Sequence, residues 1–196
     1  MQPTFAAASV RSVVIEVRPT ALDGVTELRP QRHGDERGFF SETWSKRALA
    51  DAGFDLDFVQ DNHSTSAAKG VLRGLHLQVP PVGQVKLVRV SRGSIFDVAV
   101  DIRRDSPTFG KWVGVELSAD AWNQLLIPHG FAHGFVTLEE NCEVQYKVTS
   151  PYAPEGERAI RWDDPAIGID WPIRDGLTLS DRDRAAPLLC DVETGY

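Results

Sequence analysis

The sequence predicts an all-β fold in which the strands form a closed barrel or two packed sheets. Strand-like segments follow one another at close spacing between residues 54 and 148, and turn residues such as Pro128 and Gly130 separate them. Residues 45–52 form the one clear helical pattern, which Gly53 ends. Many short strands with turns between them are typical of double-sheet and barrel proteins.

The chain is expected to fold as a single domain over residues 13–196, after a loosely held leader over residues 1–12. The extended segments predicted along this domain are residues 13–17, 24–30, 57–64, 71–78, 86–90, 94–102, 112–118, 124–138 and 142–148. The tail from Pro151 onward mixes Pro, Gly, Asp and Trp without a period and is expected to be irregular.

Two segments carry patterns that bear on a site. In residues 94–102, Asp97 and Asp101 alternate with apolar residues, which predicts a half-buried strand whose polar side chains line an interior. Residues 33–44, HGDERGFFSETW, run from a charged turn into aromatic residues. They are either a turn and strand that bury Phe40 or a ligand-binding segment, and the pattern leaves both open.

The length and composition of the chain limit which kinds of ligand and partner it can bind. A length of 196 residues suffices for a core without disulfides or metals, and the net charge of −7 with a pI near 5.2 argues against nucleic-acid binding. A local basic pocket for a phosphorylated small molecule remains compatible with that charge. Cys142 and Cys190 match no zinc spacing and are expected to be free thiols in the cytoplasm, and no membrane or export segment is recognised.

Residues 70–86, GVLRGLHLQVPPVGQVK, bring Arg73, His76 and Lys86 into an apolar, turn-punctuated run. Strict alternation would send Arg73 and His76 to opposite faces of the strand, unless Gly74 marks a bulge. His76 is either a core histidine or the base of a site that takes a proton from an anionic substrate. The lysine and arginine nearby favour the second alternative.

Several motifs in fixed order resemble one family. They are GDERGFF (34–40), FVQDNHS (58–64), VLRGLHLQ (71–78), FDVAVDIRRDSPTFG (96–110), PHGFAHGF (128–135) and LSDRD (179–183). From residue 17 to residue 189 the chain resembles the dTDP-4-dehydrorhamnose 3,5-epimerases of the cupin superfamily. The resemblance implies a cupin-type jelly-roll β barrel with a few short helices, usually a homodimer. It also implies an enzyme that needs no metal or organic cofactor and epimerises a dTDP-linked 4-keto-6-deoxyhexose.

The resemblance also implies roles for four residues. His76 matches the catalytic base and Asp183 its carboxylate partner, which would fix the tautomer and aim of the imidazole. Lys86 matches the cation that faces the substrate's 4-keto oxygen, and Tyr146 in VQYK matches the acid that delivers a proton to the opposite face.

Other residues match positions that hold the nucleotide and substrate: Arg37, Phe40, Glu42, Gln60, Asn62, Arg73 and His133. The resemblance implies that the segment around Arg37 and Phe40 is lent by the neighbouring subunit, so each site would need both chains. His133 has an equally good structural role as a hydrogen-bonding residue in a barrel corner. His63 lies beside this pocket and is assigned a supporting role.

The chain departs from the family pattern at Leu77, Val85, His129 and Asn141. These departures leave open which sugar is used and whether C3, C5 or both are inverted. Two other classes compete with this assignment: a metal-dependent cupin, which needs a His-x-His pair that His76 lacks, and a non-catalytic sugar-nucleotide binder.

Overall fold

The computed structural model describes residues 15–196. The predicted leader, residues 1–12, and the start of the first predicted strand lie outside the described residues.

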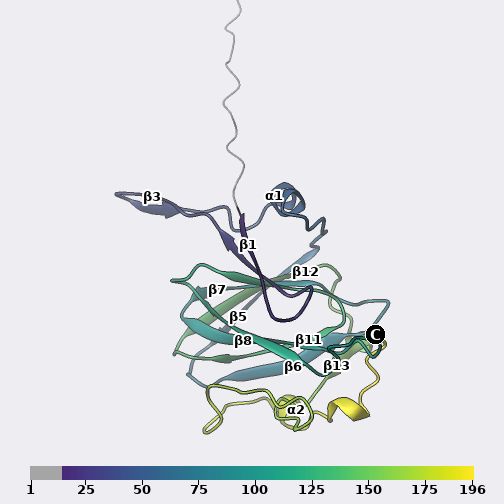
Figure 1. The fold of residues 1–196 in the computed structure, drawn as a ribbon. Helices are drawn as coiled ribbons and strands as arrows, with labels where there is room; N and C mark the ends of the chain where they lie inside the picture. The colour runs from purple at the N-terminus through teal and green to yellow at the C-terminus, as the bar shows by residue number, and fades with distance from the viewer. Residues whose placement is uncertain (1–14) are drawn as a thin grey trace, which may run out of the picture.

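Two antiparallel sheets pack face to face, as the sequence predicts (Figure 1). The six-stranded sheet contains, in spatial order, β1 (Ile15–Pro19), β2 (Thr26–Pro30), β10 (Gln124–Ile127), β7 (Lys86–Arg92), β12 (Cys142–Val148) and β5 (Gln60–Ser66). The five-stranded sheet contains β13 (Glu157–Ala159), β6 (Leu72–Gln78), β11 (Phe131–Thr137), β8 (Ser94–Asp101) and β9 (Trp112–Ser118). Consecutive strands such as β6 and β7 lie in different sheets, so sequence motifs that are neighbours along the chain are divided between the two sheets.

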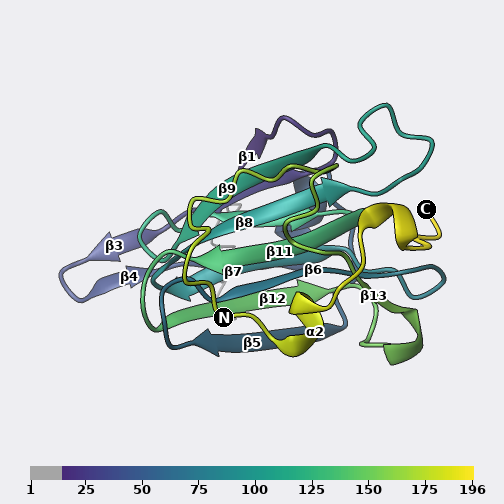
Figure 2. The ribbon, with the colours of Figure 1, turned by 90° about the horizontal axis from the view of Figure 1, so that it is seen from below.

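Three apolar layers hold the sheets. The inner layer, with Val88 and Ile95, fills the space between them. A second layer covers the outer face of the five-stranded sheet, where Trp171 of the C-terminal tail packs edge to face against Phe96 of β8. A third layer covers the outer face of the six-stranded sheet beneath α1 (Lys46–Asp51). The irregular tail is therefore a structural layer, and Figure 2 shows it running across the five-stranded sheet.

Helical content is small and close to the prediction. Ser45 caps α1, because its hydroxyl accepts a hydrogen bond from the Ala48 amide at 3.4 Å. As the family resemblance implies, further short helices are present: α2 (Asp181–Arg184) and two 3-10 helices, at Pro154–Gly156 and Leu189–Asp191, form in the tail, where the sequence pattern alone indicates none. Strand β13, which was not predicted, also comes from this tail and pairs with β6.

The prediction that residues 94–102 form a half-buried strand is wrong. Seven of the eight residues in β8 are buried, on both of its faces. Period-two polarity predicts correctly that Asp97 and Asp101 share one face and line an interior, which is the space between the sheets. The other face is buried as well, because it lies under the tail. Both carboxylates are fully buried.

A hairpin of β3 (His33–Asp35) and β4 (Gly38–Phe40) extends away from the two sheets (Figure 1). Every residue in its strands is exposed, and the strands pair with each other. The alternative in which Phe40 is buried in a strand is therefore wrong for this chain by itself, since Phe40 is 72% exposed. Within residues 15–196, no helix is long and apolar enough to cross a membrane.

Candidate active site

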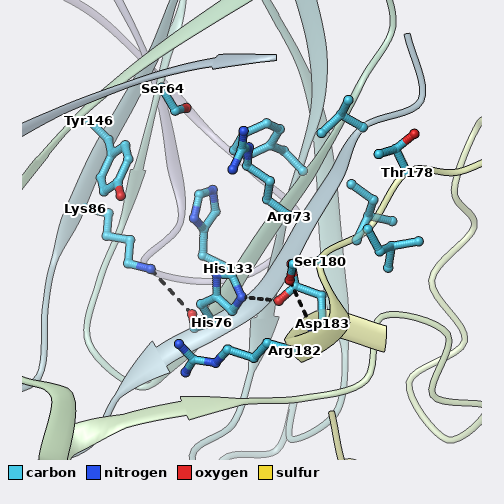
Figure 3. Close-up of a pocket in the computed structure, with 14 residues that line it drawn as sticks. Ser64, Arg73, His76, Lys86, His133, Tyr146, Thr178, Ser180, Arg182 and Asp183 are labelled. Carbon is cyan, nitrogen blue, oxygen red and sulfur yellow. Dashed lines mark hydrogen bonds and ion pairs between the residues drawn. The ribbon is translucent and has the colours of Figure 1, made fainter. Parts of the chain in front are cut away.

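A cavity of about 470 Å³ opens between the two sheets. Side chains from both sheets and from the tail line it, as Figure 3 shows. The five-stranded sheet contributes Arg73, His76 and His133, the six-stranded sheet contributes Lys86 and Tyr146, and the tail contributes Asp183. The structure thus brings together all four residues to which catalytic roles were assigned.

A bulge at Gly74 puts Arg73 and His76 on the same face of β6. The pairing of β6 with β11 matches His76 to His133 and Arg73 to Phe135, so β6 contains one extra residue in this stretch. Gly74 has a φ of +130°, and a Cβ there would lie 2.5 Å from the Cα of Gly134. Of the two possibilities that the sequence leaves open, strict alternation or a bulge at Gly74, the structure has the bulge. The bulge turns the side chains of Arg73 and His76 into the cavity.

His76 and Asp183 form a close pair. The His76 Nε2 atom lies 2.6 Å from Asp183 Oδ1, and 31% of the imidazole is exposed against 4% of the carboxylate. Burial raises the pKa of Asp183, but the His76 and Ser180 hydrogen bonds outweigh it and hold that pKa below its ordinary value. The carboxylate therefore stays ionised and fixes one ring nitrogen.

Ser180 positions Asp183 locally. Its hydroxyl caps α2 and accepts a hydrogen bond from the Asp183 amide at 3.1 Å. This turn sets the carboxylate at the cavity wall beside β6.

Lys86 lies across the cavity from this pair, on the first residue of β7. Its ammonium donates a hydrogen bond to the backbone oxygen of His76 at 3.4 Å. The residue as a whole is 8% exposed. Burial lowers the pKa of Lys86 to about 8, and the negative charges of Asp97 and Glu157 oppose that shift. The side chain is a poorly solvated cation with capacity for a further hydrogen bond.

A second histidine and carboxylate form a pair on the neighbouring strands β11 and β8. His133 Nε2 lies 2.7 Å from Asp97 Oδ1, and both side chains are buried. Burial lowers the pKa of His133 despite Asp97. Asp97 Oδ2 is buried and has no hydrogen-bond partner among residues 15–196. His133 thus has the structural contact expected of it and also lines the cavity.

Tyr146 on β12 completes the wall opposite β6. Burial raises the pKa of its phenol, and Arg73 partly offsets this. Asn62 lies directly across from Tyr146 in the pairing of β12 with β5, so both side chains lie on the same face of the sheet. Gln60, on that face of β5, donates from Nε2 to Asn62 Oδ1 at 2.8 Å. Gln60 and Asn62 thus continue the polar surface beyond the cavity.

Besides Gln60 and Asn62, three further predicted site residues lie outside the cavity. Arg37 and Phe40 belong to the exposed hairpin, where Arg37 pairs with Asp35 and is 84% exposed, and Glu42 follows the hairpin. None of them lines the cavity of the same chain. His63 faces outward on β5, 3.6 Å from Glu143.

Some cavity residues were not predicted: Ser64, Phe135, Thr178, Ser180 and Arg182. Arg182 could have been found from the sequence, since it precedes Asp183 in the LSDRD motif. In the structure it forms an ion pair with Glu157 at 2.6 Å. Nothing in the sequence indicates that Thr178 lines the cavity, because the irregular tail has no periodic pattern from which the direction of its side chains could be inferred.

The departures from the family pattern lie away from the cavity. Leu77 faces the outer layer beneath the tail, and Val85 packs in the layer beneath α1. Asn141 occupies a turn with a φ of 55°, which Asn tolerates well. His129 lies at the corner between β10 and β11. Among residues 15–196, no three His, Cys, Asp or Glu side chains are grouped as metal ligands would be, and Cys142 and Cys190 are free.

The fold and the cavity define a double-sheet β protein whose pocket is built for acid–base chemistry, with a paired histidine, a buried cation and a phenol. A family model described as dTDP-4-dehydrorhamnose 3,5-epimerase matches residues 19–191. The dTDP-4-dehydrorhamnose 3,5-epimerase of Salmonella typhimurium is 55% identical over 171 residues, which cover 87% of this chain and 93% of the relative. That of Pseudomonas aeruginosa is 52% identical over 174 residues, which cover 88% and 95%.

Solved structures agree. The epimerase RmlC of Legionella pneumophila, in complex with dTDP-4-keto-L-rhamnose, has a TM-score of 0.87 at 48% identity and covers 92% of this chain and 95% of its own. ChmJ, a 3'-monoepimerase from Streptomyces bikiniensis in complex with dTDP-quinovose, has a TM-score of 0.83 at 35% identity and covers 88% and 87%.

The chain belongs to the dTDP-4-dehydrorhamnose 3,5-epimerase family and has its cupin-type fold. It is an enzyme, an epimerase of dTDP-rhamnose biosynthesis that acts on a dTDP-4-keto-6-deoxy sugar.

Proposed function

We propose that His76 is the base that removes the proton next to the keto group, and that Asp183 orients it. The observation that carries this assignment is the 2.6 Å contact between Nε2 and a buried carboxylate, on an imidazole that is still 31% exposed. A base must be held in one tautomer and still reach substrate, and this pair meets both requirements.

Lys86 stabilises the negative charge that develops on the 4-keto oxygen. Removal of a proton next to a ketone leaves an enolate, and a preorganised cation in a desolvated site lowers its energy most. The ammonium of Lys86 is buried and points toward the His76 backbone, on the cavity side opposite Asp183.

Tyr146 returns a proton to the other face of the sugar. Inversion at carbon requires removal from one side and delivery to the other. Tyr146 and His76 belong to different sheets and line opposite walls of the cavity. Because burial raises the phenol pKa, Tyr146 keeps its proton at neutral pH.

The substrate is dTDP-4-dehydro-6-deoxy-D-glucose, inverted at both C3 and C5 to dTDP-4-dehydro-L-rhamnose. The relatives that exceed 50% identity are named for the 3,5-reaction, whereas the 3'-monoepimerase is 35% identical. Inversion of C3 or C5 alone is the second candidate, because the monoepimerase shares this fold.

The enzyme is a homodimer whose sites contain residues of both chains. Arg37 and Phe40 are of the types that bind phosphate and cover a base, yet they project from the body on an exposed hairpin. A second copy that offers its cavity to this hairpin would give both residues a ligand.

The test uses dTDP-4-keto-6-deoxyglucose in deuterated water, with the label located by NMR. Wild type should incorporate deuterium at C3 and C5. His76→Asn should lose exchange at both carbons by about a hundredfold to ten-thousandfold while still binding dTDP, and Asp183→Asn should show a smaller loss. Exchange by His76→Asn within threefold of wild type would contradict the assignment, and a label at one carbon alone would favour the monoepimerase alternative.

A further inference from the structure

Trp122 has an unusual backbone conformation for its residue type. It lies in the turn between β9 and β10 with a φ of 58°. Among residues 15–196, the other non-glycine residue in this region is Asn141, a type that tolerates it. Tryptophan gains nothing from this conformation, so its ring contacts must outweigh the local strain.

Those contacts converge on the start and end of the hairpin. The indole lies 4.8 Å from the Phe39 ring, edge to face, and its Nε1 donates to Ser41 Oγ at 2.9 Å. The Arg32 guanidinium lies over both rings, 5.2 Å from Phe39 and 5.8 Å from Trp122. Arg89 on β7 lies 5.4 Å from the same indole. Trp122 therefore ties the hairpin to the six-stranded sheet.

Among residues 15–196, the rest of the hairpin has no comparable contact with the two sheets. All residues of β3 and β4 are exposed, and these strands pair with each other. A short two-stranded ribbon does not hold its own direction in water. The angle at which it leaves the body therefore depends on the contacts at its base.

We propose that Trp122 is a positioning residue that acts in trans. It fixes the direction of the hairpin so that Arg37 and Phe40 enter the cavity of a second copy of the chain and hold the nucleotide there. This inference rests on the shared sites of the proposed function. It adds a residue that touches neither substrate nor the cavity it serves.

The first test is Trp122→Asn, which removes the indole and suits the left-handed conformation. The KM for the dTDP-sugar should rise about tenfold, which corresponds to about 1.4 kcal/mol, with kcat nearly unchanged. The melting temperature should fall only slightly, because relief of the strained backbone offsets part of the lost ring contacts. The heterodimer test below separates this positioning role from a merely structural one. Phe39→Leu should raise KM similarly, and the double variant should be less than additive because the two rings form one contact. A wild-type KM for Trp122→Asn would overturn the inference.

The second test mixes chains. In a verified heterodimer of Trp122→Asn and His76→Asn, the intact cavity belongs to the Trp122→Asn chain and receives its hairpin from the other chain. That site should have the wild-type KM. The control heterodimer pairs Arg37→Ala with His76→Asn, which should likewise regain one working site.

The outcomes separate the two proposals. If the Arg37 control recovers while the Trp122 heterodimer keeps the raised KM, the sites are shared but Trp122 does not act in trans. If neither heterodimer recovers, the shared-site proposal fails and this inference fails with it.

Discussion

At the scale of single residues, a substitution at Tyr146 should separate proton removal from inversion. Tyr146→Phe keeps the ring and its packing but removes the proton that the opposite face would receive. Deuterium incorporation should persist while formation of inverted product falls at least about tenfold, since a general acid contributes about a hundredfold or more. The measurement is deuterium content beside product yield in the same reaction. Equal, small changes in both would leave Tyr146 as a wall residue.

If Lys86 has the proposed role, activity and stability should respond oppositely to alkaline pH. Burial lowers the pKa of Lys86 from 10.5 to about 8, so the folded state loses this proton before the unfolded state does. Between these values the unfolded chain binds more protons, and the contribution of Lys86 to stability therefore rises with pH. Activity that needs the cation should fall over the same range.

Lys86→Met isolates that contribution. At pH 7 the variant should be more stable than wild type by up to about 3 kcal/mol, because it removes a desolvated charge. The difference should shrink as pH rises from about 8 to 10.5, and the variant should be inactive throughout. Denaturant unfolding at several pH values measures it. A stability difference that does not vary with pH would contradict the assigned shift.

At the scale of elements, the bulge in β6 is required for the site. Gly74→Ala would put a Cβ 2.5 Å from Gly134 Cα and 2.9 Å from the His133 carbonyl oxygen, both backbone atoms. We expect a stability loss of about 3 kcal/mol or more and a large loss of kcat, because His76 moves relative to Asp183. Gly110→Ala is the matched control, since its φ is +74° and nothing lies within 4 Å. It should cost about 1 to 2 kcal/mol and leave kcat unchanged.

Sequence reasoning succeeds for local structure. Strand positions, turns and the helix after Ser45 follow from local chemistry, and the predicted strands at 112–118 and 142–148 have the observed bounds. Whether Gly74 extends or bulges the strand depends on its contact with β11, which lies about 60 residues later in the chain. Local pattern could therefore only leave the choice open.

Sequence reasoning fails for burial and for contacts between distant strands. The pattern in β8 predicts correctly that the carboxylates line an interior, but it does not predict that the opposite face is buried too, because the tail that covers that face has no recognisable period. His76 and Lys86 were found from the residues, and Asp183 and Tyr146 from the resemblance alone. The Asp97 contact to His133 joins two strands far apart in sequence, and no spacing rule predicts it.

At the scale of the whole molecule, the proposed base and acid belong to different sheets. His76 is on β6 of the five-stranded sheet, whereas Lys86 and Tyr146 are on β7 and β12 of the six-stranded sheet. The apolar residues between the sheets therefore act as a spacer that sets the gap across which a proton is exchanged. Reaction rate should depend on the thickness of this layer.

That dependence can be measured without touching the cavity. Ile127 belongs to the inner layer and lies directly across from Lys86 in the pairing of β10 with β7, whereas Ile169 packs in the outer layer beneath the tail. Ile127→Val and Ile169→Val should each cost about 1 kcal/mol of stability. Only the first should also lower kcat, as seen in steady-state rates at a temperature where both variants are folded. Equal rates would mean that the sandwich tolerates a thinner spacer, and that the substrate itself draws the two walls to their working distance.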